Sequence, residues 1–216
     1  TAAALELAEK LRSRYQLTLS FRWNATLLRQ QGHWPGARES IDRGLAVAPQ
    51  DMTLLCDRVL LEYQVGDFVQ GEAYLERLLA TIPPAAARPG VENGFPAAII
   101  PWVARITGVL DRLDIAERAA QTVVSSPFAN PLFAMNARAG LGLLAVLRDN
   151  SAAAAEQYAA LQSHRSTMLA PLGIAVDRLL GLLAQTMGDL DKAAEHFEEA
   201  LAFCRKAGYR PELAWT

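Results

Sequence analysis

Apolar residues recur along this chain three and four positions apart, a spacing that predicts paired helices joined by short turns. The clearest stretch is 187-MGDLDKAAEHFEEALAF-203, where a Gly-Asp turn precedes a helix with alanines and an aromatic residue at fixed offsets. The same pattern recurs in 31-QGHWPGARESIDRGLAVAP-49 and 65-VGDFVQGEAYLERLLATIP-83. In each stretch a small residue stands five positions after the glycine, and a large apolar residue follows four positions later. The pattern therefore indicates a repeated unit.

Small residues at the same place in each unit extend this repeat through the chain. Weaker copies occur in 113-LDIAERAAQTVVSSP-127 and 147-LRDNSAAAAEQYAAL-161, where the turn glycine is replaced. The successive spacings are 34, 45, 38 and 39 positions for the small residues Ala37, Gly71, Ala116, Ala154 and Ala193. The last two spacings exceed the first by about one helical turn, and we expect longer helices there.

A second helical segment precedes each turn. Two of these segments contain a Leu-Gly pair, Leu141-Gly142 and Leu180-Gly181, and Ala25 and Val59 take the same place in the first two copies. Glycine inside a helix is less favourable than alanine by about 1 kcal/mol. We interpret both glycines as points where two helices approach closely, so the unit is helix, short turn, helix.

These residues resemble the tetratricopeptide repeat, and the resemblance covers nearly the whole chain. The fifth copy matches the family pattern best, at Leu180, Gly181, Gly188, Asp189, Ala193, Phe197 and Ala200. The resemblance implies an all-α fold, a right-handed superhelix (α-solenoid) of about five helix-turn-helix repeats. It also implies that Trp34 and Phe68, at the turns, wedge adjacent helices apart. The long repeats and the tail at 195–216 are similar to the C-terminal regions of bacterial signalling ATPases, either LuxR-type transcriptional activators or ATPase-linked nucleotide cyclases.

The repeat predicts the following organisation. Residues 1–17 form an N-terminal helix that either caps the array or belongs to a preceding repeat, and residues 18–82 form the first two repeats. Residues 97–210 form the last three, and residues 211–216 begin a further helix, so we expect the chain to be part of a longer protein. The intervening stretch 83–96 is rich in proline and glycine and predicts a loop, either a surface insertion or a flap over the concave face.

Composition excludes several classes of partner. The formal net charge is -2, from 21 basic and 23 acidic residues, whereas nucleic-acid-binding domains are usually clearly basic. The longest apolar run, at 139–147, is too short for a membrane span, which needs roughly 20 residues. Cys56 and Cys204 are far apart and lack metal-binding spacing, so we expect two buried, reduced thiols in a cytoplasmic protein.

No motif for catalysis or cofactor binding is found: the chain lacks a phosphate-binding loop, His-Glu-x-x-His, Cys-x-x-Cys and Gly-x-Ser-x-Gly. We therefore expect neither an enzyme nor a cofactor or metal site. His196 and Glu199 share one helix face, three positions apart. We place them on a solvated outer surface, because Ala193, Phe197 and Ala200 form the packing face.

A binding surface is the remaining function. In stacked helix pairs the first helices line the concave side, and arginine and aromatic residues are enriched where interfaces are strong. We predict a protein or peptide ligand, including a neighbouring domain of the same chain, and the arginines favour an acidic or carboxylate-ended one. Such a segment would be the sensor or scaffold of a signalling or transcription-regulatory protein; the alternative is a structural spacer or self-association module. The candidate partner-binding residues are Arg22, Trp23, Thr26, Arg29, Asp57, Leu60, Tyr63, Gln64, Trp102, Arg105, Asn136, Leu143, Arg178, Leu182 and Gln185.

Overall fold

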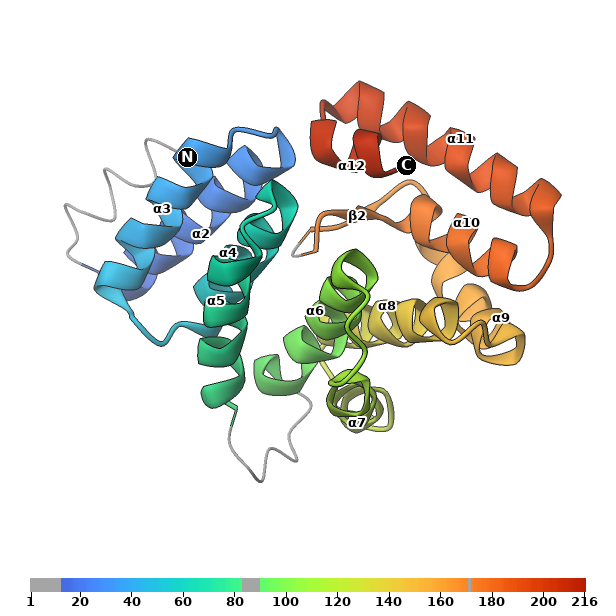
Figure 1. The fold of residues 1–216 in the computed structure, drawn as a ribbon, viewed down its shortest axis with the longest axis horizontal. Helices are drawn as coiled ribbons and strands as arrows, with labels where there is room; N and C mark the ends of the chain where they lie inside the picture. The colour runs from blue at the N-terminus through green and yellow to red at the C-terminus, as the bar shows by residue number, and fades with distance from the viewer. Residues whose placement is uncertain (1–12, 83–89, 171) are drawn as a thin grey trace. The chain divides into compact units, whose positions relative to one another are not determined.

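The structure, a computed structural model, describes residues 13–82, 90–170 and 172–216. Within these ranges it holds eleven α-helices, a short 3₁₀ turn and one hairpin of two-residue strands, so the predicted all-α class is confirmed (Figure 1). None of the helices described is both long and apolar enough to cross a membrane. The chain divides into two units, residues 1–81 and residues 82–216, which are described separately.

Unit 1 consists of two helix pairs, in which α2 packs on α3 and α4 packs on α5. Helix α4 also contacts α2 and α3. The bounds are Arg14–Gln30 for α2, Trp34–Val47 for α3, Met52–Val65 for α4 and Phe68–Ala80 for α5. The Ser13 hydroxyl caps α2 by accepting a hydrogen bond from the Gln16 backbone N–H at 3.3 Å. Residues 14–17 therefore belong to α2 and not to a separate N-terminal helix, while residues 1–12 lie outside the described ranges.

Unit 2 consists of three further pairs and a short final helix. Helix α6 packs on α7, α8 on α9 and α10 on α11, and α8 also contacts α6 and α10. The bounds are Val91–Thr107 for α6, Leu113–Val124 for α7, Pro131–Leu147 for α8, Ser151–Leu161 for α9, Val176–Thr186 for α10, Leu190–Ala207 for α11 and Arg210–Trp215 for α12. Helix α12 packs beside α11 (Figure 1). Helix α6 contains Pro96 and Pro101, so the predicted loop at 83–96 ends at the latest at Gly90, and residues 83–89 are outside the described ranges.

A short insertion separates α9 from α10. It contains the 3₁₀ turn η1 (Gln162–His164) and the antiparallel strands β1 (Met168–Leu169) and β2 (Ile174–Ala175). The last repeat spacing is long because of this insertion, since α10 has only 11 residues. The prediction of longer helices was therefore wrong for that spacing, but it holds for the one before it, since α8 has 17 residues and α4 has 14.

The turns within the pairs have the geometry that their sequence predicts. Gly66 and Gly188 adopt φ values of 82° and 83°, in the left-handed region that strongly favours glycine. The next residues, Asp67 and Asp189, cap the following helices by accepting backbone hydrogen bonds at 3.1 Å. In the fourth copy Asp149 takes the left-handed position, at φ 49°, and Asn150 is the cap.

The small residues that define the repeat are all buried, which confirms their place in the helix contacts. Ala37, Ala116 and Ala154 are completely buried, and Ala193 is 4% exposed; Gly71 is buried as well. Both cysteines are free and buried, as predicted.

The two Leu-Gly pairs differ from each other. A Cβ atom at Gly181 would lie 2.7 Å from the Phe197 ring on α11, so this glycine does allow a close approach. At Gly142 a Cβ would meet only ordinary contacts, at 3.6 Å. The close approach in α8 is instead at Gly140, where a Cβ would lie 1.9 Å from the Ala97 carbonyl oxygen of α6. The interpretation of Gly142 was therefore wrong by two residues, because α8 turns Gly140 toward α6.

Candidate partner-binding site

Five of the predicted partner-binding residues of unit 1 meet as a polar network between α2 and α4. The Thr26 hydroxyl donates to the Asp57 carboxylate at 3.3 Å, and Arg29 Nη2 lies 3.7 Å from Asp57 Oδ1. Arg22 Nε lies 4.0 Å from Asp57 Oδ2, and Arg29 Nη1 donates to Gln64 Oε1 at 3.2 Å. We call Arg22, Thr26, Arg29, Asp57 and Gln64 the Asp57 network.

Burial dominates the electrostatics of this network. Asp57 is 3% exposed and Arg29 is 1% exposed. Desolvation raises the pKa of Asp57 to about 6, although Arg29 and Arg22 oppose the shift. Desolvation likewise lowers the pKa of Arg29, which Asp57 opposes. These charges therefore face one another inside unit 1, and they join α2 to α4.

The other three residues predicted in unit 1 have different surroundings. Leu60 is completely buried, and Tyr63 donates from its hydroxyl to Glu72 at 3.0 Å. The Tyr63 ring also packs on Phe68, with centroids 5.8 Å apart, at the turn where an aromatic wedge is expected. Trp23 is 48% exposed, with the Arg22 guanidinium 5.2 Å from its ring centroid. Trp23 is therefore the exposed aromatic residue of the predicted set in this unit.

Five of the seven residues predicted in unit 2 line a single pocket. They come from the first helices of three successive pairs: Trp102 and Arg105 from α6, Leu143 from α8, and Arg178 and Leu182 from α10. Ile106, Ile174 and Trp215 complete the lining. The cavity volume is about 10 Å³, which is room for roughly one water molecule. We call this the Arg105 pocket; a larger group can enter only if side chains such as Trp215, which is 46% exposed, move aside.

The two arginines of the pocket differ in their partners. Arg178 Nε donates to Glu212 Oε1 at 2.7 Å, and the same oxygen accepts from the Ala175 backbone N–H at 2.6 Å. Arg105 makes no hydrogen bond or ion pair with any described residue. Desolvation lowers the pKa of Arg105, and the nearby Arg178 lowers it further. The pocket thus contains a partly buried cation that the described part of the chain does not neutralise.

Asn136 and Gln185 are not among the pocket residues. Asn136 is completely buried in α8, and neither polar atom of its side chain has a hydrogen-bond partner in the described ranges. Gln185 is exposed near the end of α10. The prediction of a binding surface is not tested by burial alone, and it stays a prediction for all fifteen residues.

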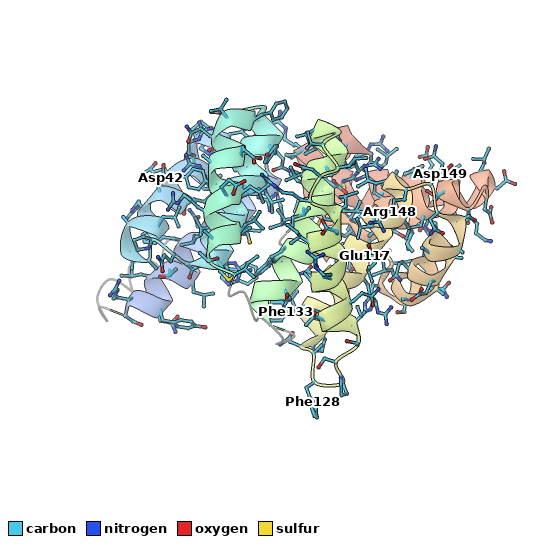
Figure 2. All side chains as sticks on the ribbon, turned by 60° about the horizontal axis from the view of Figure 1, so that its bottom comes forward. Asp42, Glu117, Phe128, Phe133, Arg148 and Asp149 are labelled. Carbon is cyan, nitrogen blue, oxygen red and sulfur yellow. The ribbon has the colours of Figure 1, made fainter. Side chains whose placement is uncertain are left out.

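A second hollow of unit 2 lies among α7, α8 and α9, with a cavity volume of about 140 Å³. Glu117 and Arg148 form an ion pair at 3.0 Å at its wall, and Figure 2 shows these two side chains close together. Phe128, which is 89% exposed, projects from the neighbouring loop in the same view. Because Arg148 is already paired with Glu117, this hollow is less suited to an anionic ligand than the Arg105 pocket is.

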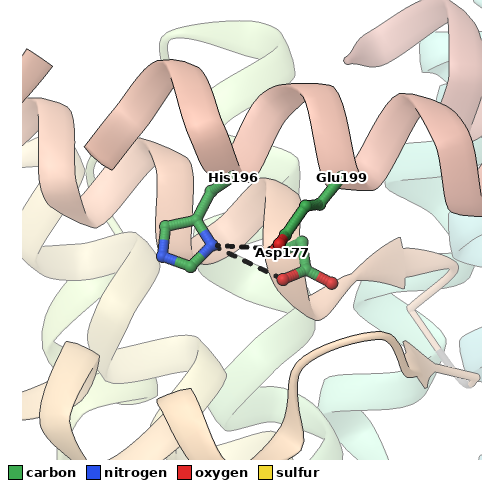
Figure 3. Close-up of side chains that lie close together, drawn as sticks. All are labelled: Asp177, His196 and Glu199. Carbon is green, nitrogen blue, oxygen red and sulfur yellow. Dashed lines mark ion pairs between the residues drawn. The ribbon is translucent and has the colours of Figure 1, made fainter. Parts of the chain in front are cut away.

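A buried polar cluster lies between α10 and α11. Asp177 comes from the first turn of α10, and His196 and Glu199 come from one face of α11 (Figure 3). His196 is 2% exposed, so the prediction that it lies on a solvated outer surface was wrong. The packing face of α11 is broad enough to include His196, which contacts Tyr158 of α9 with ring centroids 5.6 Å apart. The Glu199 side chain remains 38% exposed at the rim.

Comparison with known proteins does not place the chain in a family. No protein-family model matches it, and neither a curated protein nor a solved structure shows a significant match.

Proposed function

We propose that this chain is a non-catalytic binding module of the tetratricopeptide-repeat type, whose helix pairs form a right-handed superhelix. The repeated turns, the buried small residues and the pairing of consecutive helices support this proposal. Such arrays recognise partners on the surface of their first helices.

In this proposal the ligand is a protein or peptide that presents an acidic side chain or a terminal carboxylate to the Arg105 pocket. The observation that carries it is the unneutralised Arg105 guanidinium, which lies among the apolar walls of Trp102, Leu143 and Leu182. A charge-assisted hydrogen bond from arginine to carboxylate is strong, and apolar walls strengthen it further. Arg178, already bonded to Glu212, helps to attract the anion.

The wider setting follows from the resemblance described above. The module would be the sensor or scaffold segment of a larger cytoplasmic bacterial protein in signalling or transcription regulation. Its partner could then be a neighbouring domain of the same protein.

The experiment is a binding screen against an array of short peptides with and without acidic residues, followed by fluorescence anisotropy of the strongest binders. We expect acidic peptides to bind, and we expect Arg105→Gln to weaken their binding about tenfold or more. Arg118→Gln is the matched control, since Arg118 is 71% exposed on α7 and its one ion pair within the described residues is with Asp114 of the same helix. Equal binding by Arg105→Gln and the wild type would refute the site. Concentration-dependent dimerisation without peptide binding would support the self-association alternative.

A further inference from the structure

The cluster formed by Asp177, His196 and Glu199 has a geometry that ordinary hydrogen bonding does not explain. His196 Nδ1 lies 3.5 Å from Asp177 Oδ1 and 3.7 Å from Glu199 Oε2 (Figure 3). One potential ligand atom from each residue lies within 4.8 Å of those from the other two. Hydrogen bonds between such groups are usually about 2.7–3.2 Å long. We call these three residues the Asp177 cluster.

The distances match those between ligands of a shared metal ion. Zinc binds imidazole nitrogen and carboxylate oxygen at about 2.0–2.2 Å in a tetrahedron, so neighbouring ligand atoms are about 3.4 Å apart. Two of the three edges of the Asp177 cluster are therefore close to the tetrahedral value as the structure stands. Small rotations of the Glu199 side chain, which is 38% exposed, can adjust the third.

Two buried atoms of the cluster lack a hydrogen-bond partner among the described residues. Among the described residues neither His196 Nδ1 nor Asp177 Oδ1 makes a hydrogen bond, although both side chains are at least 98% buried. Unsatisfied buried polar atoms are rare in folded proteins, and a bound ion is one common reason for them. Figure 3 shows the ion pairs that join this face of the His196 ring to the Asp177 and Glu199 carboxylates.

The surroundings orient these atoms as a second coordination shell would. Tyr158 Oη lies 2.9 Å from His196 Nε2, and the Ser166 backbone N–H donates to Asp177 Oδ2 at 2.6 Å. When the imidazole proton is on Nε2, Tyr158 accepts it, and the Nδ1 lone pair then faces two carboxylates. Metal-binding histidines are commonly held by such a bond through their other nitrogen.

The charge balance also favours a cation. Three carboxylates gather around a single guanidinium, that of Arg165, which lies 2.5 Å from Glu199, 3.0 Å from Glu195 and 3.7 Å from Asp177. Arg165 is 40% exposed and belongs to the insertion before α10, so it can move toward solvent when a cation enters.

From these observations we propose that Asp177 Oδ1, His196 Nδ1 and Glu199 Oε2 bind a zinc ion that joins α10 to α11. Three protein ligands leave the fourth tetrahedral position to water. One imidazole and two carboxylates suit a first-row divalent ion better than they suit calcium or magnesium, which prefer oxygen ligands alone. The site is independent of the Arg105 pocket, because the two share no residue.

The test is isothermal titration calorimetry of the whole chain with zinc chloride, after removal of metal with a chelator and dialysis. We expect one zinc ion per chain. His196→Ala and Glu199→Gln should each weaken binding at least about tenfold, and Arg165→Gln should strengthen it severalfold by removing the competing cation. His164→Gln and Glu198→Gln are matched controls and should retain wild-type affinity, because they remove an imidazole and an exposed carboxylate outside the ligand set.

Thermal unfolding with and without zinc gives an independent readout, since a ligand bound only to the folded state raises the midpoint. If His196→Ala fails to fold, the partly exposed Glu199→Gln carries the test alone. Absence of zinc binding by the wild type would overturn the proposal and leave the cluster as a buried ion-pair network. Undiminished binding by Glu199→Gln would overturn it as well.

Discussion

Two aspartates, Asp57 of α4 and Asp177 of α10, are almost equally buried, at 3% and 1% exposure, but they have opposite surroundings. Asp57 faces two arginines and a threonine hydroxyl, so that cations exceed anions in the Asp57 network. Asp177 faces the His196 imidazole, the Glu199 carboxylate and the Arg165 guanidinium; because Arg165 also pairs with Glu195 and Glu199, anions exceed cations there. Burial raises the pKa of both. We infer that the sign of the uncompensated charge around a buried carboxylate, more than its depth of burial, indicates whether the cluster favours an additional cation.

The largest effect is expected from a new charge at a buried position outside both clusters. Ala193 is 4% exposed on α11, the helix that packs on α10 and carries His196. Ala193→Glu should reduce the free energy of unfolding by about 4 kcal/mol, because it places a carboxylate at a buried position. Urea denaturation measures this effect, with Ala194→Glu on the exposed face as the control. An unchanged urea midpoint would mean that the side chain at position 193 is not buried between helices.

Removing a cation from the Asp57 network comes next. Arg29→Met should destabilise unit 1 by about 3 kcal/mol at pH 7, since it leaves the Asp57 carboxylate buried beside a neutral side chain. At pH 4, where Asp57 is protonated, the same substitution should cost much less. Denaturant titrations of the wild type and of Arg29→Met at the two pH values measure this loss of stability. A loss that is the same at both pH values would contradict the pairing of Arg29 with Asp57.

The pH dependence of the wild type gives a somewhat smaller effect. Asp57 has a pKa of about 6 in the folded chain, against an ordinary value of 3.8. At Asp57 the folded state therefore binds more protons between these values, so the contribution of Asp57 to stability is greatest below about pH 4 and is lost as the pH rises through 6. The loss should be on the order of 2–3 kcal/mol. Asp57→Asn should remove this contribution to the pH dependence of the unfolding free energy. The measurement compares the unfolding free energy of the wild type and of Asp57→Asn across this pH range. Two parallel curves would show that Asp57 does not cause the pH dependence.

The smallest effect is expected for an exposed ion pair. Asp114 and Arg118 lie 2.8 Å apart on α7 with side chains that are 62% and 71% exposed. Asp114→Asn should leave the urea midpoint unchanged within error, because exposed pairs contribute little. A marked loss here would mean that the ion pairs of this protein cannot be ranked by burial.

The sequence was sufficient for those parts of the fold that depend on local chemistry. The Gly-Asp turns at 66–67 and 188–189 and the seam alanines were predictable, because a left-handed backbone or a close contact admits few residue types. The start of α6 was not predicted, because prolines usually indicate a loop, whereas here Pro96 and Pro101 both lie within the helix.

The candidate sites were predictable only in part. Helical spacing identified the five pocket residues of unit 2, since they occupy one face of successive first helices. It missed the partnership of Arg178 with Glu212, which is 34 positions away, and the burial of His196, which Tyr158 of another pair covers. Contacts between pairs depend on how the pairs stack, and no short stretch of sequence specifies that.

The insertion between α9 and α10 limits how freely this protein can be recombined. Helix pairs of repeat proteins are often exchanged, deleted or replaced by consensus pairs, because each contacts only its neighbours. Here the insertion supplies the Ser166 backbone donor and the Arg165 guanidinium to residues of the following pair. An engineered chimera that joined α9 directly to α10 would preserve the hydrophobic seam and still leave Asp177 without its backbone donor. Because Glu212 of α12 also bonds Arg178 and the Ala175 backbone, the segment from α9 to α12 is the smallest piece of this end of unit 2 that should be moved as one cassette.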